Sequence, residues 1–213
     1  MKNQTKTTLS AAAVLFIMLA LSVSAFADSQ TSGFLKEWGK TLRANTTGIP
    51  DKDVYALGRN TVLTKKDIEQ ATQFYTLSGM DPQKAKETAV EYVAQREALY
   101  HTAIENGYAV TDEEVWDYLE ELKATIQNAD NREDALAVID QFDTEEDYWN
   151  YEFTVYQKNL PIQNYVKDLE QNFMQSSTYS NAPADQTEEA WQEYFNQLKD
   201  SYVLEEDYEV VSK

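Results

Sequence analysis

The chain has 213 residues, with 18 basic and 37 acidic side chains and a formal net charge of −19. It contains no cysteine, which excludes disulfides, thiolate metal sites and cysteine nucleophiles, and its single histidine excludes most histidine-based metal and acid–base sites. The acidic balance argues against nucleic-acid binding, because phosphate contacts need clustered lysine and arginine.

Residues 1–27 have the pattern of a secretory signal peptide. Two lysines precede an unbroken apolar run that begins at Ala11, and an A-x-A cleavage site ends at Ala27. The alternative is an uncleaved membrane anchor, since the apolar stretch is nearly long enough to span a bilayer. We expect cleavage before Asp28, which gives an extracytoplasmic protein, secreted or held in the cell envelope, with no stable membrane insertion and a net charge of −21.

The next segment, residues 28–52, is a weakly patterned lead-in. Apolar residues at helical spacing predict a short helix over about residues 32–43. The polar residues 45–51 include glycine and proline and predict a loop. Asp53 to Leu57 is compatible with a short extended segment, but no pair of strands stands out in the sequence.

From Thr64 onward, residues that start and stop helices become frequent. Thr64 and Asp81 are good N-caps, and Gly79 and Gly107 are good C-terminal stops. Low glycine and proline content also argues against an all-β fold. The expected helices run from Thr64 to about 77, from Asp81 to 106, from Thr111 through 126, from Asn131 through 139, from Thr144 to about 173, and from Thr187 through 198.

The sequence therefore predicts an all-α protein of six or seven helices joined by short loops. Pro161 lies inside the longest predicted helix and is expected to kink it near residues 157–161. Residues 175–186 are predicted to be a polar linker, and the acidic tail from Glu205 is predicted to be frayed.

The sequence shows no motif for a chemical step. It lacks a glycine-rich phosphate loop, a zinc-binding helix motif and calcium-loop spacing, and no nucleophile–base pair is visible. His101 lies within a predicted helix and favours a structural or surface role. Carboxylates cluster at predicted helix starts, where they oppose the helix dipole, and loose divalent cation binding is the alternative. We expect no catalytic residue, cofactor or metal site.

The predicted helix over residues 144–173 has two apolar arcs when its residues are placed 100° apart. One interpretation is a central helix that buries both arcs, and the other is that one arc lines a groove for an apolar partner. Trp116 lies beside the main apolar stripe of its own helix. The predicted peptide-binding residues are Trp149, Phe153, Tyr156, Leu160 and Trp116.

Three stretches carry motifs in a recognisable order. Val54 to Ile68 reads V-Y-A-L-G-R-N-T-V-L-T-K-K-D-I, and Leu99 to Leu119 reads L-Y-H-T-A-I-E-N-G-Y-A-V-T-D-E-E-V-W-D-Y-L. The third, residues 142–166, is an aromatic-rich start followed by a long helix. In these motifs the chain resembles the N-terminal helical domain of the SurA and PrsA foldases, extracytoplasmic chaperones related in this part to trigger factor.

The resemblance implies a client-binding chaperone domain over residues 53–174, with a C-terminal helix and acidic tail, residues 187–213, packing back on it. Its partners would be unfolded or newly translocated exported polypeptides. In many relatives a parvulin prolyl-isomerase domain follows, but only 40 residues remain after Phe173, so isomerase activity is not expected. The alternatives are a non-catalytic envelope adaptor with one dedicated protein partner, and a prolyl isomerase with a non-parvulin site.

Overall fold

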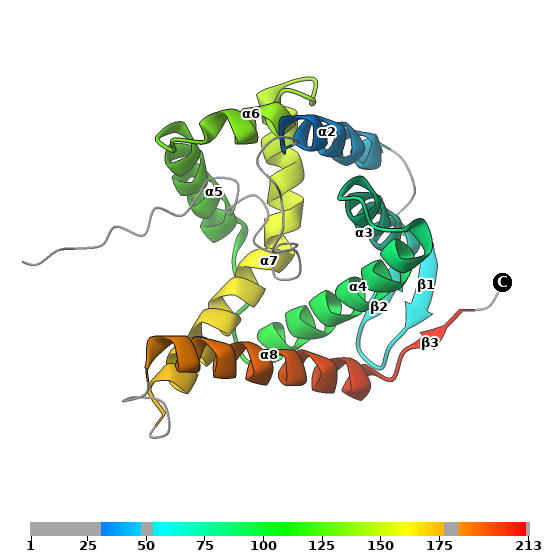
Figure 1. The fold of residues 1–213 in the computed structure, drawn as a ribbon, viewed down its shortest axis with the longest axis vertical. Helices are drawn as coiled ribbons and strands as arrows, with labels where there is room; N and C mark the ends of the chain where they lie inside the picture. Colours follow the sequence, from blue (N-terminus) through cyan, green and yellow to red (C-terminus); the bar gives the residue numbers. More distant parts are fainter. Residues whose placement is uncertain (1–30, 48–52, 177–182, 212–213) are drawn as a thin grey trace, which may run out of the picture. The chain divides into compact units, whose positions relative to one another are not determined.

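The computed structural model describes residues 31–47, 53–176 and 183–211. The predicted signal peptide and its cleavage site lie outside the described residues. Within these ranges the chain is mostly helical, with seven helices and one small sheet, which confirms the predicted all-α class (Figure 1). The described residues divide into two compact units, unit 1 with residues 31–47 and 112–154, and unit 2 with residues 53–111, 155–176 and 183–211.

Unit 1 contains four helical segments. They are α2 (Thr31–Thr47), α5 (Asp112–Gln127), α6 (Arg132–Ile139) and the first part of α7 (Glu145–Met174). Helix α2 packs on α6, and the two backbones approach closely at Gly39, where a Cβ would lie 2.7 Å from the Val138 carbonyl oxygen. Arg43 on α2 donates a hydrogen bond to Asp143, which lies in the connection between α6 and α7, so a polar contact beyond the end of α6 accompanies the helix packing.

Helix α2 is longer at its C-terminal end than the sequence predicts. Leu35, Trp38 and Leu42 form the expected buried stripe. The helix then continues through Thr47, into the first part of the predicted loop over residues 45–51, because its polar residues up to the glycine do not break a helix.

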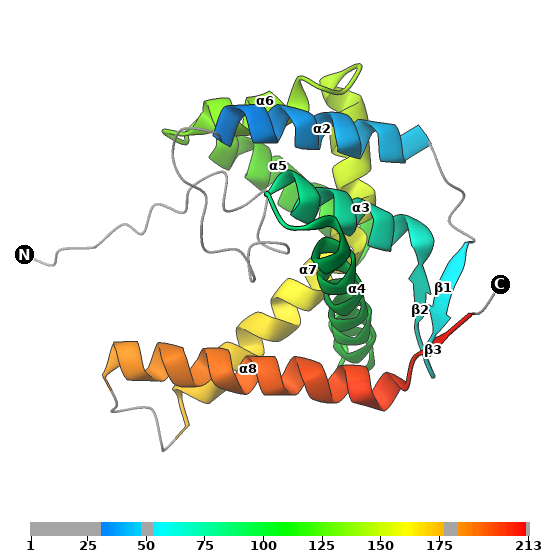
Figure 2. The same cartoon turned by 45° about the vertical axis from the view of Figure 1, so that its right-hand side comes forward.

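Unit 2 contains the remaining elements. Helix α4 (Pro82–Glu105) contacts both α3 (Lys65–Leu77) and α8 (Ala184–Glu206). The strands are β1 (Val54–Leu57), β2 (Val62–Thr64) and β3 (Glu209–Val210), and α7 contributes its residues from Val155 onward (Figure 2). The C-terminal helix packs back on the body of this unit, as predicted, although it begins at Ala184, inside the predicted linker.

Three helices begin at predicted capping residues whose side chains accept backbone hydrogen bonds. The side chain of Thr64 accepts a hydrogen bond from the Asp67 backbone N–H at 3.1 Å, and Asp81 and Thr144 cap α4 and α7 in the same way. Gly79 and Gly107 adopt positive φ values of 94° and 87° just after α3 and α4, a conformation that glycine reaches without steric cost.

The small sheet corrects one prediction made from the sequence. No strand pair stands out in the sequence, yet the structure has a sheet in the order β2-β1-β3, with β1 antiparallel to both neighbours. The expectation of a frayed tail from Glu205 is wrong. Helix α8 ends at Glu206, Asp207 takes the left-handed conformation with φ 53°, and the chain then pairs with β1 as β3.

Pro161 is fully buried inside α7, and the helix continues through it to Met174. Two tyrosine hydroxyls, those of Tyr165 on α7 and Tyr202 on α8, lie 2.6 Å apart and join these helices within unit 2.

Candidate functional site

Two of the predicted peptide-binding residues meet in unit 1. The rings of Trp116 on α5 and Phe153 on α7 are stacked, with centroids 4.7 Å apart and planes 15° apart. Both side chains are half-buried, so the stacked pair is partly open to solvent. The two helices begin directly after Thr111 and Thr144, the residues that the sequence marks as helix starts.

A third predicted residue, Trp149, lies one turn before Phe153 on α7 and is buried. Its indole Nε1–H donates to the Glu145 carboxylate at 2.9 Å, and the Lys123 ammonium lies 4.9 Å from its ring centroid. A cation over an indole face is a favourable contact. Trp149 is therefore held in place by polar partners at both its edge and its face.

Further aromatic rings extend this group into the core of unit 1. Tyr148 contacts Trp149 edge to face at 5.0 Å, and Phe142 contacts Tyr148 at 5.2 Å and Tyr151 at 5.8 Å. These rings pack mainly as tilted or edge-to-face pairs, the arrangements that aromatic rings prefer. We call this group the aromatic cluster, and its members are Trp116, Phe142, Tyr148, Trp149, Tyr151 and Phe153.

The last two predicted residues, Tyr156 and Leu160, belong to unit 2 and are buried. Together with Trp149, they place most of this apolar arc of α7 in the core. The accessible part of the predicted set is the stacked pair of Trp116 and Phe153.

Sequence reasoning missed a buried carboxyl group next to the cluster. Glu152 is only 8% exposed, and burial raises its pKa to about 7. A hydrogen bond with the Tyr148 side chain lowers this pKa, but its effect is smaller than that of burial. Glu152 lies four residues after Tyr148 and therefore on the same face of the helix. This spacing is the feature of the sequence that indicates its burial.

Glu152→Gln is expected to stabilise unit 1 at pH 8 by about 1–3 kcal/mol and to have almost no effect at pH 5. The pKa of Glu152 is higher in the folded chain than in the unfolded one. The native protein is therefore favoured below the unfolded pKa and loses that advantage as the pH rises through about 7. Urea unfolding followed by tryptophan fluorescence measures the effect, since Trp38, Trp116 and Trp149 all lie in unit 1.

The matched control is Glu146→Gln, which changes an exposed carboxylate on the same helix and should leave the pH dependence unchanged. A pH profile identical in the wild type and the Glu152→Gln variant would contradict the prediction.

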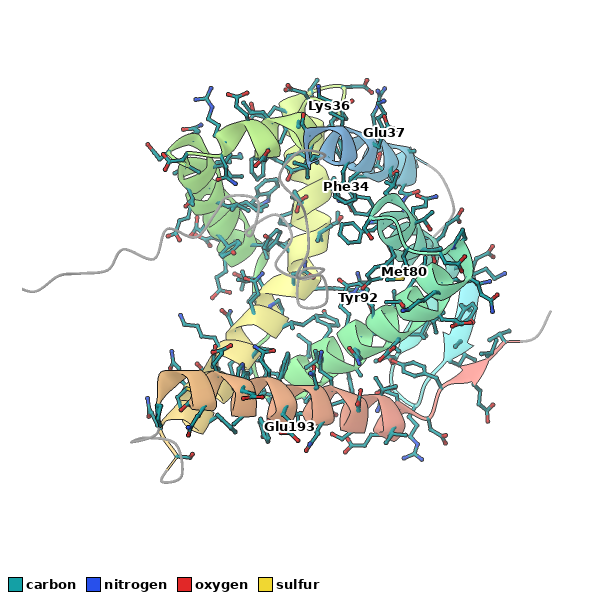
Figure 3. All side chains as sticks on the ribbon, in the orientation of Figure 1. Phe34, Lys36, Glu37, Met80, Tyr92 and Glu193 are labelled. Atoms are coloured by element: carbon teal, nitrogen blue, oxygen red, sulfur yellow. The ribbon has the colours of Figure 1, made fainter. Side chains whose placement is uncertain are left out.

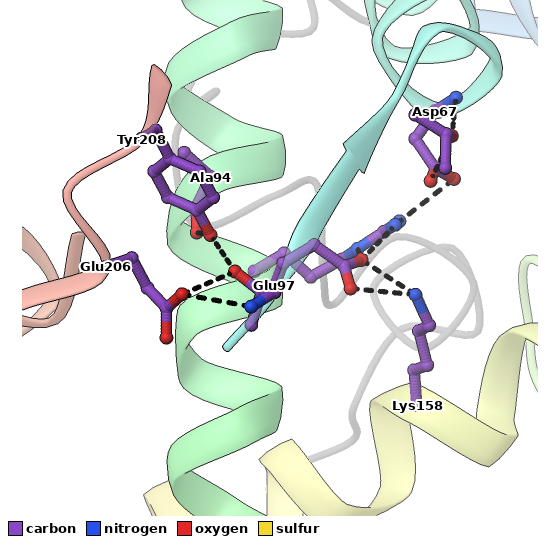
Figure 4. A network of polar contacts seen from close by, with 9 residues as sticks. Asp67, Ala94, Glu97, Lys158, Glu206 and Tyr208 are labelled. Carbon is purple, nitrogen blue, oxygen red and sulfur yellow. Dashed lines mark hydrogen bonds and ion pairs between the residues drawn. The ribbon is translucent and has the colours of Figure 1, made fainter. Parts of the chain in front are cut away.

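Unit 2 contains a second group that sequence reasoning did not find, a polar network on α4 (Figure 4). Glu97 is 4% exposed and accepts hydrogen bonds from Arg96 at 2.8 Å and from Lys158 at 2.8 and 2.9 Å. Arg96 also pairs with Asp67 at 3.2 Å. Burial alone would raise the pKa of Asp67, but Arg96 and the hydrogen bond from Thr64 together hold it below its usual range.

The same figure shows the end of α8 held beside α4. Glu206 is 3% exposed, and its carboxylate accepts hydrogen bonds from the backbone N–H groups of Asn60 and Thr61 at 2.9 and 3.0 Å. Both side chains donate to it as well. The Tyr208 hydroxyl lies 2.5 Å from the Thr61 hydroxyl, and the loop between β1 and β2 is thereby fixed to the end of α8.

The remaining charged side chains are mostly solvent-facing, as Glu37 on α2 and Glu193 on α8 illustrate (Figure 3). His101 lies 3.5 Å from Glu105, one helical turn away. Within the part of the chain that the structure describes, no group of three or more histidine and carboxylate side chains is placed to hold a metal ion. None of the described helices combines the length and the apolar character needed to cross a membrane.

Comparison with known proteins finds no matching family model, no matching curated protein and no matching solved structure. The likeness to the SurA and PrsA foldases therefore rests on the three sequence stretches alone.

Proposed function

We propose that the protein is an exported, chaperone-like protein that binds unfolded or newly translocated polypeptides without a chemical step and without isomerase activity. The observation that carries the proposal is the stacked pair of Trp116 and Phe153, two large rings that unit 1 leaves partly in solvent. Aromatic side chains of this kind contribute much of the free energy in protein–protein contacts.

The construction of the aromatic cluster supports this role. Trp149 is fixed by Glu145 and Lys123, and its buried position one turn from Phe153 gives the half-buried pair a rigid base. A rigid aromatic surface loses little conformational entropy on binding, so more of the contact energy appears as affinity. The pair offers apolar contact without requiring a particular client sequence.

Three properties of the sequence agree with the proposal. Residues 1–27 have the pattern of a signal peptide, which would deliver the protein to the compartment where translocated chains emerge. The net charge of −19 keeps a protein with partly exposed rings soluble. Residues 54–173 also resemble a chaperone domain in the three stretches quoted above.

The proposal is tested by light scattering during refolding of two unrelated aggregation-prone proteins, with and without the purified protein. We expect both clients to be protected at a near-stoichiometric ratio. Replacing Trp116 and Phe153 together by alanine should weaken client binding about tenfold or more, as truncation of an aromatic hot spot does, while far-UV circular dichroism keeps its helical signal.

A second stacked pair supplies the matched control. Phe173 and Tyr194 in unit 2 are stacked with centroids 5.1 Å apart, and their double alanine variant removes a similar aromatic area. Protection that both double variants reduce equally would argue against a specific surface. Protection of only one client, or of neither, would favour the adaptor with a dedicated partner, and catalysis of peptide isomerisation by the pure protein would overturn the non-catalytic assignment.

A further inference from the structure

Exposed apolar side chains gather on the small sheet of unit 2. Among the described residues, eight large apolar side chains are exposed, and four of them belong to the strands or follow β3 directly. A fifth, Leu204, lies on the last turn of α8, which Glu206 fixes to the sheet. The four residues of the sheet are Leu57, Val62, Val210 and Val211.

The strand register places three of these side chains on one face. Leu57 is the direct partner of Val62 on β2 and of Glu209 on β3, and direct partners in an antiparallel pair share a face. Val211 follows Glu209 by two residues and returns to that face. Leu57, Val62 and Val211 are 49%, 42% and 45% exposed, and we call them the outer sheet face.

The opposite face of the sheet is covered at β1 and β2, whereas Val210, the partner of Ala56 on the edge strand, is 63% exposed. Ala56 and Leu63 are direct partners and are each only 1% exposed, and β2 contacts both α3 and α4. The sheet thus has an inner face in the core of unit 2 and an outer face that is apolar and open. The apolar side chains of the outer face are therefore not needed for the core of unit 2.

Strand β3 is an edge strand of the sheet and has β1 as its partner (Figure 2). The Val211 backbone N–H donates to the Tyr55 carbonyl oxygen at 2.9 Å, so the polar groups of Val211 point toward β1. Backbone groups alternate in direction along a strand, and the N–H and C=O of Val210 therefore point away from β1, to the open edge. An extended segment is the structure that pairs with such an edge.

The acidic side chains around β3 favour a basic segment as the binding partner. Glu205, Asp207 and Glu209 lie within five residues of chain, and Arg59 pairs with Asp207 at 3.5 Å. Pairing of β3 with β3 of a second copy would bring these carboxylates together, which costs free energy. A segment with lysine or arginine would instead be attracted to them.

We propose that the outer sheet face and the edge of β3 bind an extended basic segment of another polypeptide, in which apolar residues alternate with lysine or arginine, as a fourth strand of the sheet. This surface lies on different elements from the aromatic cluster. It is independent of the proposed chaperone function.

The test is fluorescence anisotropy of a labelled peptide titrated with the full chain. The probe peptide alternates valine with lysine, and its counterpart carries a glutamate in place of each lysine. We expect the basic peptide to bind at least about tenfold more tightly than the acidic one, and the difference to shrink at high salt.

Three variants test the apolar, charge and backbone parts of the surface, and Leu57→Lys tests the first two together because the new cation also repels the basic peptide. Leu57→Lys and Glu209→Lys should each weaken binding of the basic peptide about tenfold, whereas Leu77→Lys on α3 and Glu193→Lys on α8 should not. Val210→Pro removes the backbone N–H that points to the open edge but leaves the hydrogen bond from Val211 to β1, so it should weaken peptide binding. Val210→Ala keeps that N–H and should weaken peptide binding less.

Equal affinity for the two peptides would overturn the proposal. It would also be overturned if neither Leu57→Lys nor Val210→Pro changed the affinity for the basic peptide. Self-association in sedimentation that Leu57→Lys abolishes would assign the face to a second copy of the chain and would also overturn it. The double alanine variant of Trp116 and Phe153 should bind the basic peptide normally, so failure of the chaperone proposal is distinguishable from failure of this one.

Discussion

Arg96→Met should destabilise unit 2 by about 2–4 kcal/mol, somewhat less than the loss of one partner from a fully buried ion pair, because the guanidinium compensates both the buried Glu97 and the partly buried Asp67. The guanidinium lies between Glu97, at 2.8 Å, and Asp67, at 3.2 Å. Without it, Asp67 loses the charge that keeps its pKa low, and Glu97 retains Lys158 as a partner. Methionine fills most of the volume of the arginine side chain, so the loss of stability reflects mainly the electrostatic contribution of Arg96 and only to a small extent its packing.

Hydrogen exchange of the α4 and α3 amides is the appropriate measurement, since it reports on unit 2 separately from unit 1. Arg59→Met is the matched control. It removes an arginine from a largely exposed ion pair with Asp207, and such pairs contribute roughly 0–1 kcal/mol. If the two variants lost the same protection, the network on α4 would be no more important to stability than a surface pair.

The helices of this chain could be predicted because their boundaries depend on local interactions. Thr64, Asp81 and Thr144 accept hydrogen bonds from backbone groups two or three residues away, and Gly79 and Gly107 supply the positive φ that ends a helix. These interactions lie within a few residues of one another and are visible in the sequence.

The sheet could not be predicted in this way. Its strands have four, three and two residues, too few to show an alternation of apolar and polar side chains. Strand β3 pairs with a strand more than 150 residues earlier in the chain, and the buried carboxylate of Glu206 just before it binds the loop between β1 and β2. A run of acidic residues at the end of a sequence resembles a solvated tail, and the structure shows instead that one of them is a core residue.

The candidate site shows the same limit. A helical wheel finds two apolar arcs on α7, but the neighbours that cover each arc are set by tertiary packing. Trp149, Tyr156 and Leu160 are buried, and only Phe153 of that arc meets Trp116 at a partly open position. The buried acids did carry a signal, because Glu97 follows Ala85, Ala89 and Val93 in steps of four and so lies on their buried stripe.

Glu206→Gln should release the C-terminal end of α8 and β3 at a cost of about 2–4 kcal/mol at pH 7, since charge-assisted hydrogen bonds contribute about twice as much as neutral ones. The carboxylate accepts four hydrogen bonds from Asn60 and Thr61, and glutamine replaces one acceptor oxygen by an N–H₂ group that faces donors. The adjacent Glu205→Gln changes an exposed carboxylate and is the matched control.

The effect of Glu206→Gln is also expected to depend on pH. Burial raises the pKa of Glu206, but the hydrogen bonds from Asn60 and Thr61 together outweigh it and hold the pKa below its usual value. The stabilisation is therefore complete above the unfolded pKa of about 4.3 and is lost as the pH falls through the lower folded value. Amide exchange of β1 and β3 should differ between the wild type and Glu206→Gln at pH 7 and converge under strong acid. A difference that persists unchanged into strong acid would mean that the substitution acts through packing, and that the ionised carboxylate does not hold β3 in the sheet.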